Sequence, residues 1–187
     1  MTTNPGKFRE VAALLEPLGI RTVWKRRALP EPQATTLEEV VQAKLRALPR
    51  TSGWTLVEDS GLFMRGIRGF PGVYSAYAYE TIGLEGLLRL LEGKERAADF
   101  RTVAGLRHGR LEYLLAGHCP GLIADAPRGT GGFGFDPIFI PEGRSETFAQ
   151  MPLADKNELS HRARAIRAAG AMLIRESRRA PRTSASR

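Results

Sequence analysis

Apolar residues along the chain recur at helical spacing in some stretches and form short continuous runs in others. Asn4-Pro5 suits the N-cap and first turn of a helix whose apolar face follows at 11–18. Thr36 and Glu39 form a capping box for a second helix, and Ser160 suits the cap of a last one. The pattern therefore predicts helices over residues 5–18, 36–48, 83–92 and 160–178.

Between these helices lie short apolar runs that are typical of strands. His108-Gly109 separates two such runs and indicates a hairpin. Residues 60–80 are rich in Gly, Pro and aromatic side chains, and the pattern assigns no element to them. Interleaved helices and strands favour an α/β fold. The predicted strands span residues 20–24, 54–59, 100–107, 110–119 and 138–140.

Length and composition narrow the class of protein. The 187 residues show no internal repeat and no linker, so we expect one domain over 1–178, followed by a basic tail at 179–187. The single cysteine, Cys119, excludes an intramolecular disulfide framework and a cysteine-based zinc site. No run reaches 18 apolar residues, and the N-terminus lacks the apolar core of a signal peptide. A cytoplasmic protein without a membrane segment is the expectation.

The formal net charge of +8 is unevenly distributed. Residues 160–187 hold eight arginines and one acidic residue, whereas residues 1–159 hold 20 basic and 19 acidic side chains. The body is therefore nearly neutral, which argues against a nucleic-acid-binding surface over the whole protein. Arginine outnumbers lysine by 23 to 5, so each lysine merits individual attention.

The segment 2–7 is the first candidate site. Thr2, Thr3, Asn4, Pro5, Gly6 and Lys7 form a short polar turn that leads into a helix. Free amides and the positive end of the helix dipole favour an anion at such a place, and Lys7 adds a charge. The alternative is an ordinary capped helix start.

Acidic residues end the predicted strand 54–59. Open α/β sheets place ligands beyond the carboxyl ends of their strands, and carboxylates there suit a hard divalent cation. Mg²⁺ takes only one or two protein carboxylates, so Asp59 and Glu31 form a candidate pair. The alternative is that both are solvated loop acids.

Two further segments carry candidate binding residues. Four glycines within 129–137 permit close backbone approach, and Phe133 and Phe135 offer flat faces for a base. In 156–162, His161 and Arg162 place two potential cations in the first turn of a helix, against its dipole. A glycine-rich hairpin and a solvated arginine-rich helix start are the respective alternatives.

Three of the five lysines, Lys7, Lys44 and Lys156, lie in or beside these segments. A chain that otherwise uses arginine has kept a compact ammonium at these positions, which suits phosphate. Lys44 lies at the edge of an apolar helix face, where a surface lysine with a buried stem is the alternative.

In order along the chain, these segments resemble the inosine/xanthosine triphosphate pyrophosphatase family. Any one of them is weak, but six in order are specific, and they span residues 2 to about 175. The matching segments are Thr2-Thr-Asn-Pro-Gly-Lys7, Leu29-Pro-Glu-Pro32, Glu58-Asp-Ser-Gly-Leu62, Gly69-Phe-Pro-Gly-Val-Tyr-Ser75, Gly131-Gly-Phe-Gly-Phe-Asp-Pro137 and Lys156 through Ser160-His-Arg162.

The resemblance implies a two-lobed α/β fold around a long mixed sheet, with the active site in the cleft, and a homodimer. It implies Mg²⁺-dependent hydrolysis of ITP, dITP or XTP to the monophosphate and pyrophosphate. Carried over by position, Thr2 to Lys7 and Lys44 hold phosphates, Glu31 and Asp59 bind metal, Asp59 is the suggested general base, and Ser60 contacts substrate. The purine pocket is then formed by Phe133, Gly134, Phe135, Asp136, Lys156, His161 and Arg162.

The residue types suit this chemistry independently of the family. A triphosphate with Mg²⁺ needs cations, amides, one or two carboxylates and a positioned water. Asp59 is open to two roles, orienting that water or holding metal. A donor such as Arg162 or His161 pairs with the 6-keto oxygen of the base and leaves the amino group of ATP unpaired.

One departure from the family pattern is that only Met1 precedes the first motif, where relatives have an apolar strand. We expect a start site assigned too far downstream, which an intact mass of the native protein would test.

Three alternatives to this function remain at this point. The first is a related nucleotide diphosphatase with another base preference, such as the Maf-like group. The second is nucleic-acid binding through the basic C-terminus, with steep salt dependence and no metal. The third is an inactive family member.

Overall fold

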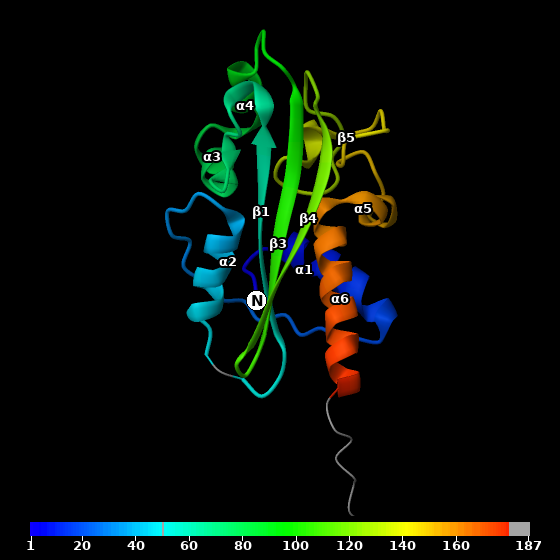
Figure 1. Cartoon of the computed structure of the whole chain (residues 1–187). Helices are drawn as coiled ribbons and strands as arrows, with labels where there is room; N and C mark the ends of the chain where they lie inside the picture. Colours follow the sequence, from blue (N-terminus) through cyan, green and yellow to red (C-terminus); the bar gives the residue numbers. More distant parts are fainter. Residues whose placement is uncertain (50, 180–187) are drawn as a thin grey trace, which may run out of the picture.

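The computed structural model describes residues 1–49 and 51–179. Within them, a five-stranded sheet has the order β2-β1-β3-β4-β5 (Figure 1). Three long strands form its centre, and two short strands pair at its edges. The strands are β1 (Thr55–Met64), β2 (Pro71–Gly72), β3 (Ala97–His108), β4 (Leu111–Ile123) and β5 (Phe139–Pro141).

Every strand pairing in the described residues is antiparallel, so the expected mixed sheet is wrong. The connections explain this, because β3 and β4 are joined by a two-residue turn, which only antiparallel neighbours allow. Gly109 adopts a φ of 59° in that turn, a conformation that favours glycine. The predicted hairpin is thus confirmed, with its turn at Gly109-Arg110.

The strand β1 is longer than the sequence pattern predicts. Asp59 was expected to end it, but the pairing with β3 continues from Ser60 as far as Met64. Gly61 lies within this extension, where the carbonyl of Gly72 in β2 approaches so closely that a Cβ would not fit. The two acids therefore lie in the middle of a strand and not beyond its end.

The predicted strand at 20–24 is also wrong. Among the described residues this segment is extended but belongs to no ladder. Its neighbourhood contributes one backbone bond to the N-terminal turn, from the Thr2 N–H to the Lys25 carbonyl at 3.4 Å. Val23 remains 69% exposed, so alternation alone does not bury this segment against a sheet.

Six α-helices cover the sheet in the described ranges. Asn4 caps α1 as predicted, and the Thr36–Glu39 capping box begins α2. The helix α6 begins after Ser160 as predicted, while α3 and α5 arise in segments to which the pattern assigned no helix. The helices are α1 (Pro5–Leu15), α2 (Leu37–Arg46), α3 (Ser75–Thr81), α4 (Gly83–Leu90), α5 (Leu153–Leu159) and α6 (His161–Arg179).

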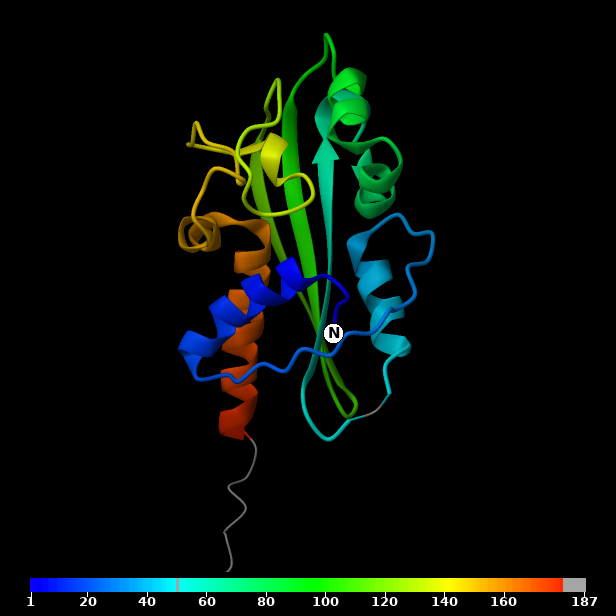
Figure 2. The same ribbon diagram turned by 180° about the vertical axis from the view of Figure 1, so that it is seen from behind.

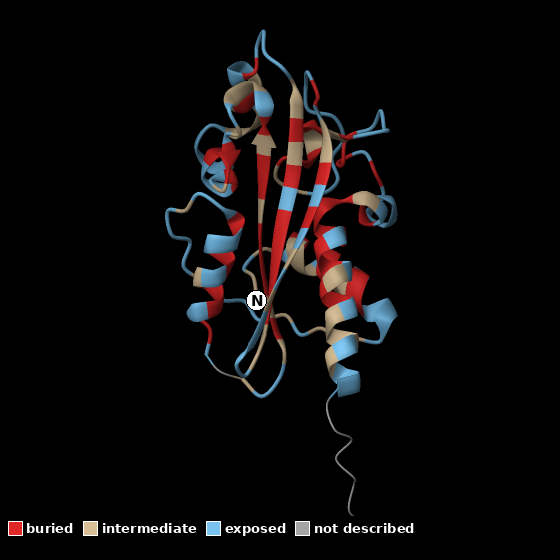
Figure 3. Cartoon of the chain, in the orientation of Figure 1, coloured by how far each residue is buried: buried red, intermediate tan, exposed pale blue. Residues whose placement is uncertain are grey.

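The helices lie on both faces of the sheet. Val57 and Val103 pack against α2 on one face, whereas Ala104 packs against α1 and α6 on the other. Figure 2 shows α1 crossing α6 on that second face. Buried residues follow the strands and the sheet-facing sides of the helices (Figure 3). The adjacent residues Val103 and Ala104 therefore pack into two separate hydrophobic cores, one on each face of the sheet.

No described helix is long and apolar enough to cross a membrane. The predicted tail begins at residue 179, the last residue of α6, and its remaining residues, 180–187, lie outside the described part of the chain.

Candidate active site

Glu58 and Asp59 are neighbours on β1 and therefore face opposite sides of the sheet. On the α1 side, Lys7 Nζ lies 2.7 Å from Glu58 Oε1. On the α2 side, Lys44 Nζ lies 2.5 Å from Asp59 Oδ1. The middle of β1 thus carries one ion pair on each face, and two helices supply the lysines.

Lys44 joins Asp59 to the loop before α2. Its ammonium also donates a hydrogen bond to Glu31 Oε1 at 3.0 Å, so two carboxylates converge on one cation. Burial opposes the charge, but Asp59 and Glu31 together hold the pKa of Lys44 above its ordinary value. The predicted metal ligands are therefore brought together, and Lys44 is a buried ion-paired residue and not a surface lysine.

A second cluster lies among α1, α5, α6 and the short helical turn Asp136–Ile138. Lys156 Nζ donates to Glu10 Oε1 at 2.8 Å and to Asp136 Oδ2 at 2.5 Å. Arg162 donates to the other oxygen of Glu10 at 2.5 Å. All four side chains are almost completely buried, so each charge depends on the others for its compensation.

Ser60 joins the second cluster to β1. Arg162 donates to Ser60 Oγ at 3.1 Å, and Ser60 in turn donates to Glu58 Oε2 at 2.7 Å. Thr102 on β3 contacts the same hydroxyl at 2.6 Å. A continuous series of polar contacts therefore runs from Lys7 through Glu58 and Ser60 to Arg162.

The cations of these clusters lower the pKa of Glu58 and Glu10, whereas burial raises the pKa of Asp59 and Asp136 despite Lys44 and Lys156 beside them. Burial would raise the pKa of Glu58, but Lys7 and Arg162 outweigh it and hold the pKa far below the ordinary range. Burial would also raise the pKa of Glu10, but Arg162 and Lys156 outweigh burial and lower this pKa. Glu58 and Glu10 are therefore charged at neutral pH.

His161 has a different environment from its neighbour Arg162. Its ring stacks on Phe100 with centroids 4.3 Å apart, and Nδ1 has no hydrogen-bond partner in the described structure. Burial, together with Arg162 and Lys156, holds the pKa of His161 well below 6.5. Only one of the two expected cations at the start of α6 is thus charged at neutral pH, and that arginine is ion-paired.

The glycine-rich segment divides between the site and the core. Phe133 lies against the charged cluster, with Lys156 Nζ 5.1 Å and Arg162 Cζ 5.3 Å from its ring centre. Gly134 has a φ of 60°, which allows the chain to turn sharply between the two aromatics. Phe135 is buried in the hydrophobic core and packs edge-on against the exposed ring of Tyr79, whereas Phe133 lies against the charged cluster.

The N-terminal turn offers fewer free amides than the sequence predicts. Asn4 Oδ1 accepts the N–H groups of Gly6 at 2.8 Å and Lys7 at 3.1 Å. The N–H of Asn4 donates to Thr2 Oγ1, and Pro5 has none. The capping that begins α1 therefore uses the amides that were expected to face an anion.

A family model for the Ham1 family matches residues 1–172. The chain belongs to the Ham1 family. A dITP/XTP pyrophosphatase of Thermococcus kodakarensis is 50% identical over 169 residues, which are 89% of this chain and 91% of that protein. Its counterpart in Pyrococcus horikoshii is 49% identical over 170 residues, which are 90% of this chain and 91% of that protein.

Solved Ham1 structures share the fold. A HAM1 protein from Coxiella burnetii has a TM-score of 0.75 and 28% identity, and the match covers 92% of this chain and 95% of that one. A nucleoside-triphosphatase, dITP/XTP pyrophosphatase, from Mycobacterium abscessus has a TM-score of 0.64 and 30% identity. That match covers 92% of this chain and all of the other.

Sequence reasoning did not single out Glu10, Glu58 or Thr102 as site residues of this Ham1 chain. Glu10 had a detectable signal, because it stands four residues before Leu14 on the apolar face of α1. An acid within an apolar stripe indicates a buried partner. Thr102 had no such signal, since only strand register brings it to Ser60.

The donor set fits a magnesium ion. Glu31 and Asp59 supply hard carboxylate oxygens and already share one cation, the Lys44 ammonium. No group of three or more His, Cys, Asp or Glu side chains in the described residues is arranged to hold a metal by itself. Two carboxylates are what Mg²⁺ uses when substrate phosphates complete its shell.

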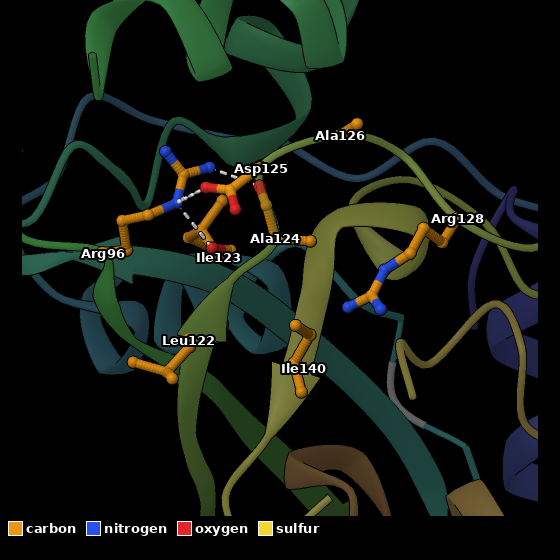
Figure 4. A pocket seen from close by; sticks show the side chains of 8 residues that line it. All are labelled: Arg96, Leu122, Ile123, Ala124, Asp125, Ala126, Arg128 and Ile140. Atoms are coloured by element: carbon orange, nitrogen blue, oxygen red, sulfur yellow. Dashed lines mark hydrogen bonds and ion pairs between the residues drawn. The ribbon is translucent and has the colours of Figure 1, made fainter. Parts of the chain in front are cut away.

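A separate pocket of about 450 Å³ lies at the other end of the sheet, beside β4 and β5 (Figure 4). Arg96 turns toward Asp125 there, with Nε 3.2 Å from the carboxylate. None of the predicted site residues lines this pocket. Its lining residues are Arg96, Leu122, Ile123, Ala124, Asp125, Ala126, Arg128 and Ile140.

Proposed function

We propose that this Ham1 chain hydrolyses dITP, XTP and ITP to the nucleoside monophosphate and pyrophosphate. The curated relatives at 49–50% identity are named dITP/XTP pyrophosphatases, and they align over about nine-tenths of the chain. The observation that carries the proposal is the polar series from Lys7 to Arg162. It connects residues suited to bind phosphate, at Lys7, with residues suited to bind a purine base, at Arg162.

The phosphate end is formed by the N-terminal turn and two lysines. Lys7 and Lys44 approach β1 from opposite faces, so a triphosphate lying along the edge of this strand has an ammonium on either side. Glu58 fixes Lys7 by its ion pair, and Asp59 fixes Lys44. These pairs hold the cations in place before substrate arrives, which reduces the entropy lost on binding.

Glu31 and Asp59 are the residues that would hold Mg²⁺. When bound, this ion neutralises phosphate charge and polarises the phosphoryl oxygens. When no metal is bound, the Lys44 ammonium lies between the two carboxylates and compensates their mutual repulsion.

Asp59 is the proposed catalytic residue. Lys44 contacts its Oδ1, and the carboxylate accepts a hydrogen bond from the water that attacks the α-phosphorus. The bond from that water to phosphorus forms as the bond to the pyrophosphate oxygen breaks, and the water proton passes to the carboxylate. Ser60, fixed by Arg162 and Glu58, supplies a hydroxyl on the opposite face of β1 from Asp59.

The base end is formed by Phe133, Arg162 and neutral His161. Arg162 has only donors, so it pairs with the 6-keto oxygen of hypoxanthine or xanthine. The 6-amino group of adenine is itself a donor and leaves that guanidinium without an acceptor. Lys156 and Asp136 support the pocket, and the glycine-rich turn at Gly134 aims Phe133 at the base.

The proposal extends to the architecture of the working enzyme. Residues 1–178 form one diphosphatase domain of two lobes with the site in the cleft between them. Supporting this, Asp59 and Ser60 lie midway along β1, between the end that lies near α3 and the end that lies near α2 (Figure 1). The family resemblance supports a homodimer.

The reaction products test this function. The enzyme is incubated with ITP, XTP and dITP, with and without Mg²⁺, and the products are separated by anion-exchange chromatography. We expect the monophosphate and pyrophosphate in equal amounts, and only when Mg²⁺ is present. Release of inorganic phosphate with the diphosphate, or Mg²⁺-independent turnover, would contradict the proposal.

A further inference from the structure

Trp24 contacts the N-terminal turn at two points, although it lies outside every predicted site segment. Its indole Nε1 donates a hydrogen bond to the Thr2 carbonyl at 2.9 Å. Its ring stacks on Phe8 of α1, with centroids 5.2 Å apart and an angle of 10°. One side chain therefore fixes both the start of the turn and the helix that follows it.

The turn has one backbone donor left for an anion. The amides of Thr2, Asn4, Gly6 and Lys7 all have acceptors in the protein. Among the described residues, the Thr3 N–H has no such acceptor. It is therefore the one amide between Thr2 and Lys7 that can donate to a ligand.

Trp24 sets the direction of that amide. The Thr2 carbonyl and the Thr3 N–H belong to the same planar trans peptide group, so they point in opposite directions. The bond from the indole to the carbonyl turns the Thr3 N–H away from Trp24. Rotating the peptide to withdraw this donor would break the bond to Nε1.

We propose that Trp24 is a positioning residue for phosphate, which acts by holding the Thr3 backbone N–H toward the pyrophosphate portion of the substrate. The inference rests on the proposed function, because it assigns phosphate to this turn. Withdrawal of electron density by the indole from the shared peptide group also makes the Thr3 N–H a better donor.

The main test measures binding of inorganic pyrophosphate by calorimetry. Trp24→Phe keeps an aromatic ring against Phe8 and removes the N–H donor together with part of the indole, and the inosine control below accounts for the lost packing. We expect its Kd for pyrophosphate to rise about 3- to 10-fold, the effect of one hydrogen bond.

Trp54→Phe is the matched control, because Trp54 stacks on His108 at the far hairpin. Its Kd for pyrophosphate should equal that of the wild type. Inosine, which carries no phosphate, should bind equally well to Trp24→Phe and wild type, whereas a merely structural role would weaken both ligands. Equal pyrophosphate binding by Trp24→Phe and wild type, or a parallel loss of inosine binding, overturns the inference.

A second measurement leaves Trp24 in place. The chain has two tryptophans, so its spectrum contains two indole N–H signals, which Trp54→Phe assigns. Pyrophosphate should shift the Trp24 signal and leave the Trp54 signal unmoved; an unmoved Trp24 signal overturns the inference. If the wild type hydrolyses dITP but these tests fail, the role of Trp24 is wrong and the proposed function stands. If the wild type does not hydrolyse dITP, the proposed function itself is wrong, whatever the variants do.

Discussion

Gly6 lies directly beneath the ring of Phe133, so closely that a Cβ on this glycine would be 2.5 Å from the ring carbon Cδ1. The start of α1 and the glycine-rich segment, 127 residues apart in the chain, therefore meet at a position where only glycine fits. This contact joins the proposed phosphate turn to the proposed base pocket.

Gly6→Ala should displace the Phe133 ring from Lys156 and Arg162. Overpacking of this kind costs about 1–3 kcal/mol, and we expect kcat/KM for ITP to fall about tenfold or more. Gly53→Ala is the control, because nothing lies within 4 Å of the added carbon. A Gly6→Ala enzyme with wild-type kcat/KM would show that Phe133 does not contribute to the pocket.

Glu10→Gln should destabilise the fold strongly. The change removes the carboxylate that Arg162 and Lys156 share and leaves both cations buried with fewer partners. We expect the free energy of unfolding at pH 7, measured in urea, to fall by about 3 kcal/mol. Glu85→Gln removes an exposed pair with Arg89 and should leave the urea midpoint unchanged.

The stabilities of wild type and Glu10→Gln should converge at acidic pH. The folded-state pKa of Glu10 is depressed, so its contribution is complete above the ordinary value of 4.5 and is lost as pH falls through the folded pKa. The stability difference between wild type and Glu10→Gln should therefore shrink below about pH 4.5. A difference that stays constant down to pH 3 would argue against an ionised Glu10.

His161 should make the protein less stable at mildly acidic pH. Its folded-state pKa lies well below 6.5, so the unfolded chain binds a proton that the folded state refuses. The contribution of the neutral His161 to the free energy of unfolding is therefore complete above pH 6.5. Below pH 6.5 it falls by about 1.4 kcal/mol per pH unit until the folded-state pKa is reached. Urea unfolding at pH 7.5 and 5.5 measures this slope.

His161→Phe keeps the stacking on Phe100 and removes the titration, so its slope between these pH values should be smaller by one proton. Identical slopes in wild type and His161→Phe would mean that the imidazole is protonated in the folded protein.

Asp59→Asn should fold and fail to turn over. Lys44 keeps its bond to Glu31, so the fold is supported while the water loses its acceptor. We expect pyrophosphate release from ITP to fall at least about 100-fold, with little change in melting temperature. Asp125→Asn, at the exposed rim of the separate pocket, is the control and should remain active. A fully active Asp59→Asn enzyme would remove this residue from the mechanism.

Local signals made the starts of α1 and α2 predictable. Asn4 and the pair Thr36–Glu39 cap their own helices through contacts within four residues, so the sequence contains the whole interaction. The lysines were predictable for another reason: they are rare in this chain, and Lys44 and Lys156 turn out to be buried in ion pairs.

Long-range contacts were not predictable in the same way. Glu10 and Arg162 are 152 positions apart, and only the crossing of α1 and α6 brings them together. The continuation of β1 past Asp59 depends on its pairing with β3, which no local alternation shows. Phe135 and Phe133 are two residues apart in one motif, yet the positive φ of Gly134 between them sends one side chain to the core and the other to the site.

The most direct measurement is the ratio of kcat/KM for dITP to that for dATP, with Mg²⁺ present. The two substrates differ at the purine 6-position, which is where Arg162 and neutral His161 are proposed to read the base. We expect a ratio of about 100 or more in favour of dITP, since the Arg162 guanidinium has only donors and offers no acceptor to the amino group of adenine. Equal values for the two nucleotides would contradict it.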